Sequence, residues 1–188
     1  MVAGFDRIRS ELNVPTAFPD AVLQAAADSV AAGPRIPPGA DSTIIDARDL
    51  PFMAIDPPGS TDLDQAFFAR RHGDGYTVFY AIADPASLIA PGGPVDLEAR
   101  DRGLTLYSPD LRTSLHPESI NEDGGSLLEG QDRRALLWTI EMDGDGVLGD
   151  ACLQRADVRT RHQLSYQAAQ AEMDTAGPDD ALTLLREI

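Results

Sequence analysis

The sequence contains no lysine, a single cysteine and no apolar run long enough to cross a membrane. Cys152 alone excludes a disulfide within the chain and fits a reducing compartment. Because this cysteine lies in a segment of alternating apolar residues, we expect a buried structural thiol rather than a nucleophile. Residues 1–7 lack the apolar core of a signal peptide. We therefore expect a cytoplasmic protein with no membrane partner.

The charge balance is strongly acidic. Against 31 aspartates and glutamates stand 15 basic residues, all of them arginine, which gives a formal net charge of -16. Phosphate binding usually needs a positive surface, so composition alone argues against a nucleic-acid-binding protein. Two arrangements would still permit it. A few arginines with bound metal ions could form a local positive site, or basic modules that hold the nucleic acid could lie on chain that is absent from these 188 residues.

An acidic stretch follows a short apolar run at residues 50–55. The run is bounded by proline and glycine, which predicts a buried strand leading into a loop, with Asp56 at the strand's end. If residues 62–64 are extended, Asp62 and Asp64 lie on one face, and carboxylates that close need protons or cations between them. Hard oxygen ligands of this kind suit Mg²⁺ or Mn²⁺. On spacing alone, a solvated acidic turn remains the alternative.

The stretch resembles the signature of the catalytic RNB domain in the ribonuclease II / ribonuclease R family. That signature reads Ile-Asp, five residues, Asp, one residue, Asp-Asp, and here it is completed by Asp64-Gln65 instead of Asp-Asp. Further segments resemble the family in the same order along residues 48–173; they are residues 80–85, 95–110, 116–120, 126–128 and 161–166. Several ordered motifs together make this resemblance specific.

The resemblance implies a hydrolytic 3′→5′ exoribonuclease that converts single-stranded RNA to 5′-nucleotides with Mg²⁺ or Mn²⁺. Asp56, Asp62 and Asp64 are then the expected catalytic residues and metal ligands, with Asp64 the most sensitive position. Gln65 carries no charge, so we expect it to be a weak neutral metal ligand or an orienting hydrogen-bond partner.

The same resemblance assigns RNA contacts to a loop of the pattern Arg-Gly-x-x-x-Tyr at residues 102–107. Tyr107 is expected to be a stacking platform for bases near the RNA 3′ end, because an aromatic face stacks on any base. Arg102 is expected to bind RNA beside it. A partly buried loop aromatic is the alternative for Tyr107.

The expected fold class is α+β, with mainly antiparallel strands and short helices. We expect a helical N-terminal appendage and linker at residues 1–46, and the N-terminal half of an RNB-like domain at residues 47–188. Hairpins are predicted at residues 66–82, turning at Asp74-Gly75, and at residues 133–158, turning at residues 143–146. Helices are predicted within residues 5–31 and at residues 96–102, 166–173 and 179–188.

An RNB domain is about twice as long as the matching segment, so its C-terminal half is an expected partner. The family resemblance places an arginine that contacts the scissile phosphate in that half, and we expect residues 1–188 alone to be inactive. One alternative function is a non-catalytic RNA-binding or regulatory relative whose metal site is degraded at Gln65. Another is an inert fragment that only binds divalent ions.

Overall fold

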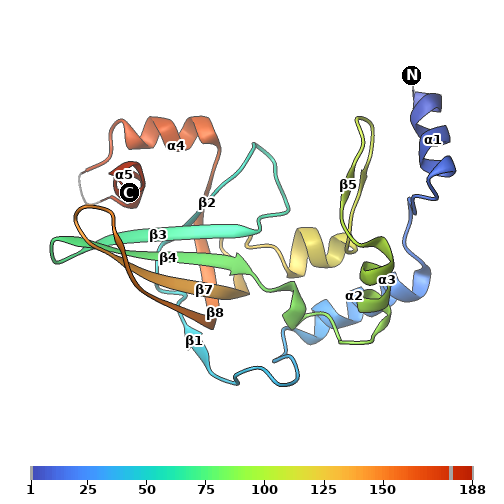
Figure 1. The fold of residues 1–188 in the computed structure, drawn as a ribbon, viewed down its shortest axis with the longest axis horizontal. Helices are drawn as coiled ribbons and strands as arrows, with labels where there is room; N and C mark the ends of the chain where they lie inside the picture. The colour runs from blue at the N-terminus through green and yellow to red at the C-terminus, as the bar shows by residue number, and fades with distance from the viewer. Residues whose placement is uncertain (1, 178–179, 188) are drawn as a thin grey trace. The chain divides into compact units, whose positions relative to one another are not determined.

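The computed structural model describes residues 2–177 and 180–187. These residues form two compact units, each built from two segments that are distant in the sequence. One, which we call the helical unit, comprises Met1–Gly39 and Pro85–Gly124; the other, the sheet unit, comprises Ala40–Asp84 and Gly125–Ile188. Figure 1 shows the ribbon of both.

The sheet unit is built on a mixed, mainly antiparallel six-stranded sheet. Its strands are β1 (Ile44–Asp46), β2 (Phe52–Ile55), β3 (Gln65–His72), β4 (Gly75–Ala83), β7 (Asp132–Met142) and β8 (Leu148–Leu164). The order is β1-β8-β2-β3-β4-β7, and β7 also pairs with β8, so the sheet closes on itself. The pairs β1–β8 and β2–β8 are parallel and the others are antiparallel. The predicted α+β class is confirmed.

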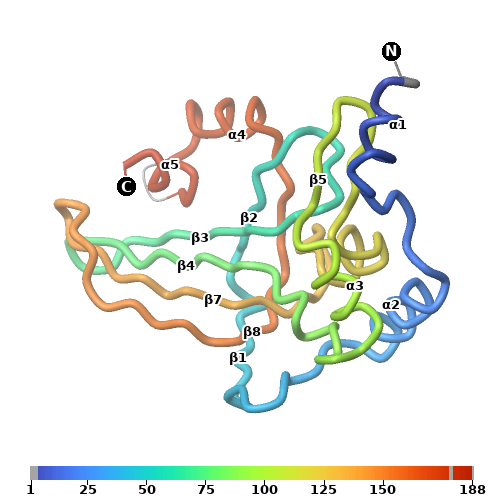
Figure 2. Tube along the Cα trace, turned by 45° about the vertical axis from the view of Figure 1, so that its right-hand side comes forward, coloured from blue at the N-terminus to red at the C-terminus, as the bar shows by residue number. Residues whose placement is uncertain are grey.

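Two hairpins supply four of these strands. In the first, His72 pairs with Gly75, so the turn is Gly73-Asp74, one residue earlier than the predicted Asp74-Gly75. Gly73 has φ +61°, a conformation that glycine adopts at no steric cost. In the second, which Figure 2 follows from β7 into β8, the Asp143 carboxylate accepts from the backbone N–H groups of Asp145 and Val147. That turn was predicted correctly.

Neighbouring residues along the strands point to opposite faces of the sheet, and they pack into two separate clusters. Phe52, Ala54, Leu63, Leu137 and Val158 are fully buried members of the main core. A second cluster packs Met53 and Phe67 against the helices α4 (Tyr166–Met173) and α5 (Ala181–Glu187), through residues such as Ala169 and Leu182. Ser165 caps α4, because its side chain accepts from the Ala168 N–H at 3.1 Å. Residues 179 and 188 of the last predicted helix lie outside the described residues.

Cys152 corrects one expectation. It lies on β8, but its side chain is exposed rather than buried. The neighbouring positions 148–154 are all exposed as well. Alternation of apolar residues therefore does not identify a buried face here.

The described residues of the helical unit form three α-helices, a π-helical segment, a 3₁₀ turn and a small hairpin. They are α1 (Val2–Glu11), α2 (Asp20–Ala32), α3 (Pro94–Arg102), the two-stranded pair β5 (Leu106–Tyr107) and β6 (Arg112–Thr113), and a π-helical segment, η2 (Ser119–Gly124); a 3₁₀ turn, η1, covers Pro85–Ser87. Val22 and Ala26 on α2 pack against Leu88, Val95 and Ile120. The predicted domain boundary between residues 46 and 47 stays a prediction. No helix in the described ranges is long and apolar enough to span a membrane.

Candidate active site

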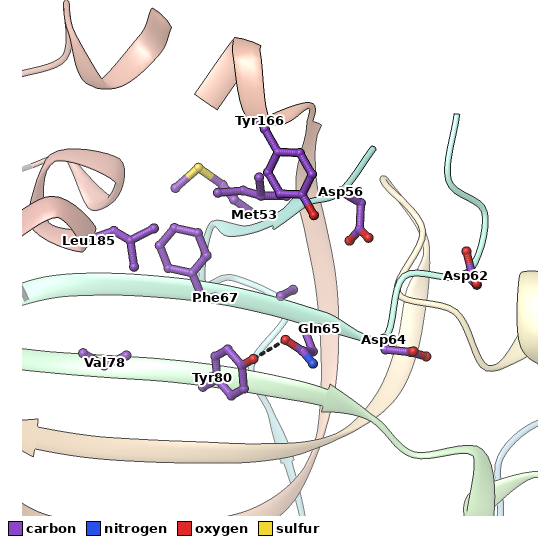
Figure 3. A pocket seen from close by; sticks show the side chains of 12 residues that line it. Met53, Asp56, Asp62, Asp64, Gln65, Phe67, Val78, Tyr80, Tyr166 and Leu185 are labelled. Carbon is purple, nitrogen blue, oxygen red and sulfur yellow. Dashed lines mark hydrogen bonds between the residues drawn. The ribbon is translucent and has the colours of Figure 1, made fainter. Parts of the chain in front are cut away.

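A pocket of about 420 Å³ opens in the sheet unit at the start of β3. Asp56, Asp62, Asp64 and Gln65 line one side, which we call the acidic end (Figure 3). The opposite side, the apolar wall, is formed by Met53, Phe67, Val78 and Leu185. Tyr80 and Tyr166 also line the pocket, together with Ile55 and Ala66.

The period of two along the first hairpin explains which side chains reach the pocket. Gln65 and Phe67 are two residues apart on β3, and they face Ile82 and Tyr80 respectively on β4. Cross-strand partners share a face, so Gln65, Phe67, Tyr80 and Val78 project from one side of the hairpin. The intervening residues on the other side enter the main core.

The acidic loop is held by the leucine in its middle. Leu63 is fully buried; its N–H donates to the Ser126 hydroxyl at 2.8 Å and its carbonyl accepts from the Leu127 N–H at 2.9 Å. Because Leu63 is buried, its neighbours Asp62 and Asp64 are directed to the pocket instead. The predicted shared orientation of these two aspartates therefore has a packing cause.

Asp56 is fixed from a different strand. It follows β2, and its N–H donates to the Leu164 carbonyl at the end of β8, at 3.0 Å. Burial raises the pKa of the Asp56 carboxyl above its usual range, and the nearby Asp62 carboxylate raises it further. The two side chains are thus close enough to repel when both are ionised, which a cation would relieve.

The donor set suits a hard cation, but it is not a closed cage. Among residues 2–177 and 180–187, no group of three or more His, Cys, Asp or Glu side chains is placed to hold a metal ion. Mg²⁺ usually keeps several waters and binds one or two carboxylates together with substrate phosphates. The three aspartates around one pocket fit that open mode of binding.

Gln65 has a defined hydrogen-bond partner on the neighbouring strand β4. Its side-chain oxygen, Oε1, accepts a hydrogen bond from the Tyr80 hydroxyl (Figure 3). Sequence reasoning did not single out Tyr80, nor the lining role of Tyr166. The sequence did hold a local pattern for each tyrosine. The period of two along the hairpin places Tyr80 on the same face as Val78, and Tyr166 directly follows the helix cap Ser165.

The two residues predicted to contact RNA belong to the helical unit. Tyr107 lies at the end of β5 and is 77% exposed, as a stacking platform must be. Arg102 ends α3, and its side chain is only 3% exposed. Both roles stay predictions.

The Arg102 guanidinium already has several partners. Its Nε donates to Glu98 at 2.9 Å and its NH2 group to the Ala17 carbonyl at 2.6 Å. It also stacks over the Phe18 ring, with 3.7 Å between the guanidinium carbon and the ring centroid. These contacts give Arg102 a structural use in joining α3 to the segment before α2.

The family follows from comparison with known proteins. The RNB domain matches residues 44–185, and the chain belongs to the RNB-domain family of ribonuclease II and ribonuclease R. The resemblance inferred from the motifs is thereby confirmed.

Individual relatives cover most of this chain. It is 33% identical over 143 residues to exoribonuclease 2 of Vibrio vulnificus strain YJ016, covering 75% of this chain and 22% of that protein. It is 30% identical over 161 residues to the chloroplastic/mitochondrial ribonuclease II of Arabidopsis thaliana, covering 85% of this chain and 20% of that protein. The chain thus spans about a fifth of the length of these curated relatives.

Solved structures support the fold. RNase R of Mycoplasma genitalium, in complex with ribose-methylated single-stranded RNA, matches with a TM-score of 0.81 and 21% identity, over 99% of this chain and 29% of that one. Yeast Ssd1, described as a pseudonuclease, matches with a TM-score of 0.68 and 21% identity, over 83% of this chain and 20% of that one. At these identities the likeness concerns the fold alone.

Proposed function

We propose that this chain forms the N-terminal part of a hydrolytic 3′→5′ exoribonuclease that degrades single-stranded RNA to 5′-nucleotides in the cytoplasm. The observation that carries the proposal is the acidic end, where the three aspartates of the family motif line one pocket. Their arrangement on an anchored loop and a strand end favours a site built for function over a solvated turn.

Asp56, Asp62 and Asp64 would hold Mg²⁺ or Mn²⁺ together with waters and phosphate oxygens of the RNA. The ion, when bound, supplies an activated water and neutralises charge developing on the phosphoryl group. The chain's own contribution is placement. Buried Leu63 keeps two carboxylates aimed at the pocket, and the apolar wall limits water on the opposite side.

Tyr107 would contribute to holding RNA in the helical unit. Stacking of a base on an exposed aromatic ring contributes roughly 1–3 kcal/mol with little sequence preference. The strongly acidic composition offers little general attraction for RNA, so such local contacts matter more here.

The test is an Asp64→Asn substitution in the complete protein that joins these residues to the rest of an RNB domain. The change keeps the shape of the side chain and removes a charge that would bind the ion. We expect turnover of labelled single-stranded RNA to fall by about 10²-fold or more, the typical loss for one preorganised electrostatic contact, with little change in RNA affinity.

The matched control is Asp74→Asn, the same chemical change in the exposed turn before β4. It should leave turnover unchanged. An Asp64→Asn protein that retains most of its rate would refute the assigned role.

A second candidate is a non-catalytic RNA-binding relative. Gln65 in place of an acidic residue favours it. In that case the complete protein would bind single-stranded RNA without shortening it, and Asp64→Asn would change neither property.

A further inference from the structure

Gln65 occupies the position in the acidic end that carries no charge. It is the first residue of β3, directly after Asp64, and its side chain is exposed in the pocket. Gln65 pairs with Ile82 of β4, and Tyr80 is two residues from Ile82 on that strand. Diagonal neighbours of this kind lie within reach of an aromatic side chain, which explains the hydrogen bond between Tyr80 and Gln65.

That hydrogen bond decides which part of the amide faces a ligand. The carboxamide oxygen is the only side-chain atom of Gln65 that can bind a metal ion, and one of its two lone pairs accepts from the Tyr80 hydroxyl. Within the described part of the chain, the amide nitrogen Nε2 forms no hydrogen bond. With one lone pair of the oxygen taken by Tyr80, Nε2 is the polar side-chain atom of Gln65 that keeps its full hydrogen-bonding capacity, and it is a donor.

A donor at this point has one evident use. The other three side chains of the acidic end are carboxylates, which only accept hydrogen bonds when ionised and which repel an anion. Gln65 can therefore bind an anionic oxygen where its neighbours cannot. A carboxylate at position 65 would instead add another negative charge and another acceptor.

We propose that Gln65 binds a phosphate oxygen of the nucleotide in this pocket through Nε2, that Tyr80 is its positioning residue, and that Gln65 is not a metal ligand. This rests on the proposed function, since it takes the pocket to hold a nucleotide. It replaces the expectation that Gln65 is a weak metal ligand with a role in substrate binding.

The experiment measures two affinities of the chain by calorimetry, for Mn²⁺ alone and for adenosine 5′-monophosphate in saturating Mn²⁺. The variants are Gln65→Leu, which removes the amide without adding charge, and Tyr80→Phe, which removes only the hydroxyl. Gln167→Leu is the control, because it makes the same change at an exposed position of α4 that does not line the pocket.

We expect Gln65→Leu to weaken nucleotide binding roughly tenfold, the effect of losing one hydrogen bond to a charged group, and to leave Mn²⁺ affinity within about twofold. Tyr80→Phe should weaken nucleotide binding in the same direction, by less. The double variant should bind the nucleotide no more weakly than Gln65→Leu, because Tyr80 acts through Gln65. A purely structural tyrosine would give additive losses.

Three results would overturn the proposal. They are weaker Mn²⁺ binding by Gln65→Leu, unchanged nucleotide binding by that variant, and no nucleotide binding by the wild type. None of them decides the proposed exonuclease activity, which depends on the Asp64→Asn test in the complete protein. Conversely, a failure of the Asp64→Asn activity test would not change the expected affinities for Mn²⁺ and for adenosine 5′-monophosphate.

Discussion

Arg9 and Asp110 form a long-range ion pair inside the helical unit. Arg9 lies on α1, its side chain is 8% exposed, and its NH1 donates to the Asp110 carboxylate at 2.7 Å. The hydrogen bond from Arg9 lowers the pKa of the Asp110 carboxyl. A lowered pKa in the folded state stabilises the protein above the unfolded pKa, near 4, and this contribution is lost as the pH falls through the folded pKa.

We therefore predict that Asp110→Asn lowers the urea midpoint at about pH 7, and that its difference from wild type shrinks below about pH 4. Urea titrations at several pH values would measure it. Asp101→Asn, at an exposed position of α3, is the control and should leave the midpoint unchanged throughout. A difference that stays constant down to about pH 3 would show that the ion pair is not its source.

At the scale of residues, motif spacing identified side chains that line one pocket, whereas their roles as catalytic residues and metal ligands stay predictions. Buried Leu63 directs Asp62 and Asp64 to the pocket, and Asp56 reaches it from the end of β2. The burial of Arg102 was not predictable from its own segment. It depends on Phe18, a residue more than 80 positions earlier, which no local pattern connects to it.

At the scale of elements, Gly75 allows the strands β4 and β7 to approach each other closely. A Cβ atom at this position would lie 2.1 Å from the Met142 carbonyl oxygen on β7, far inside contact distance. The backbone would have to shift, so we predict that Gly75→Ala lowers the free energy of unfolding by roughly 1–3 kcal/mol, the usual cost of overpacking.

Chemical denaturation would measure this loss. The control is Gly4→Ala on α1, where a Cβ would meet nothing within 4 Å. Alanine is favoured over glycine inside a helix by roughly 0.5–1 kcal/mol, so this control should be neutral or slightly stabilising. Equal effects at both positions would disprove the close approach as the reason for Gly75.

Gly75 also explains why the first turn was predicted one residue late. Glycine stands at both 73 and 75, so local turn chemistry alone cannot choose between the two positions. The packing of β4 against β7 decides between them, because Gly75 is needed at that close contact and Gly73 takes the positive φ of the turn.

The predicted helices α3 and α4 were confirmed because their start and stop signals are local, such as Gly103 after α3.

Two features of the sheet could not be found by reading locally. β1 has only three residues, too few for a periodic pattern, and it exists because it pairs in parallel with β8. β8 itself extends to Leu164, beyond the expected residue 158, because its second part pairs with β2 instead of β7. Parallel partners distant in sequence leave no turn signal between them.

At the scale of the whole molecule, we predict that residues 1–188 alone do not degrade RNA processively. The chain spans about a fifth of its curated relatives, and its formal charge of -16 favours neither binding nor retention of a polyanion. Incubation with labelled single-stranded RNA and Mn²⁺, followed by gel analysis, should show intact substrate.

The matching positive control adds the complementary C-terminal half of an RNB domain as a second chain. We expect a stable complex and RNA shortening to appear together. Release of mononucleotides by residues 1–188 alone, as a monomer, would contradict the prediction and assign the whole active site to this chain.

The closure of the sheet by β8 has a consequence for how the protein is made. On the ribosome, Ile44 emerges about 110 residues before its partner Arg155. At ~5–20 residues per second, β8 is synthesised roughly 5–20 s after β1 and β2, the two strands with which it pairs in parallel. Throughout that interval their apolar residues have no native partner on β8, so binding by a chaperone during synthesis would favour the correct pairing over aggregation.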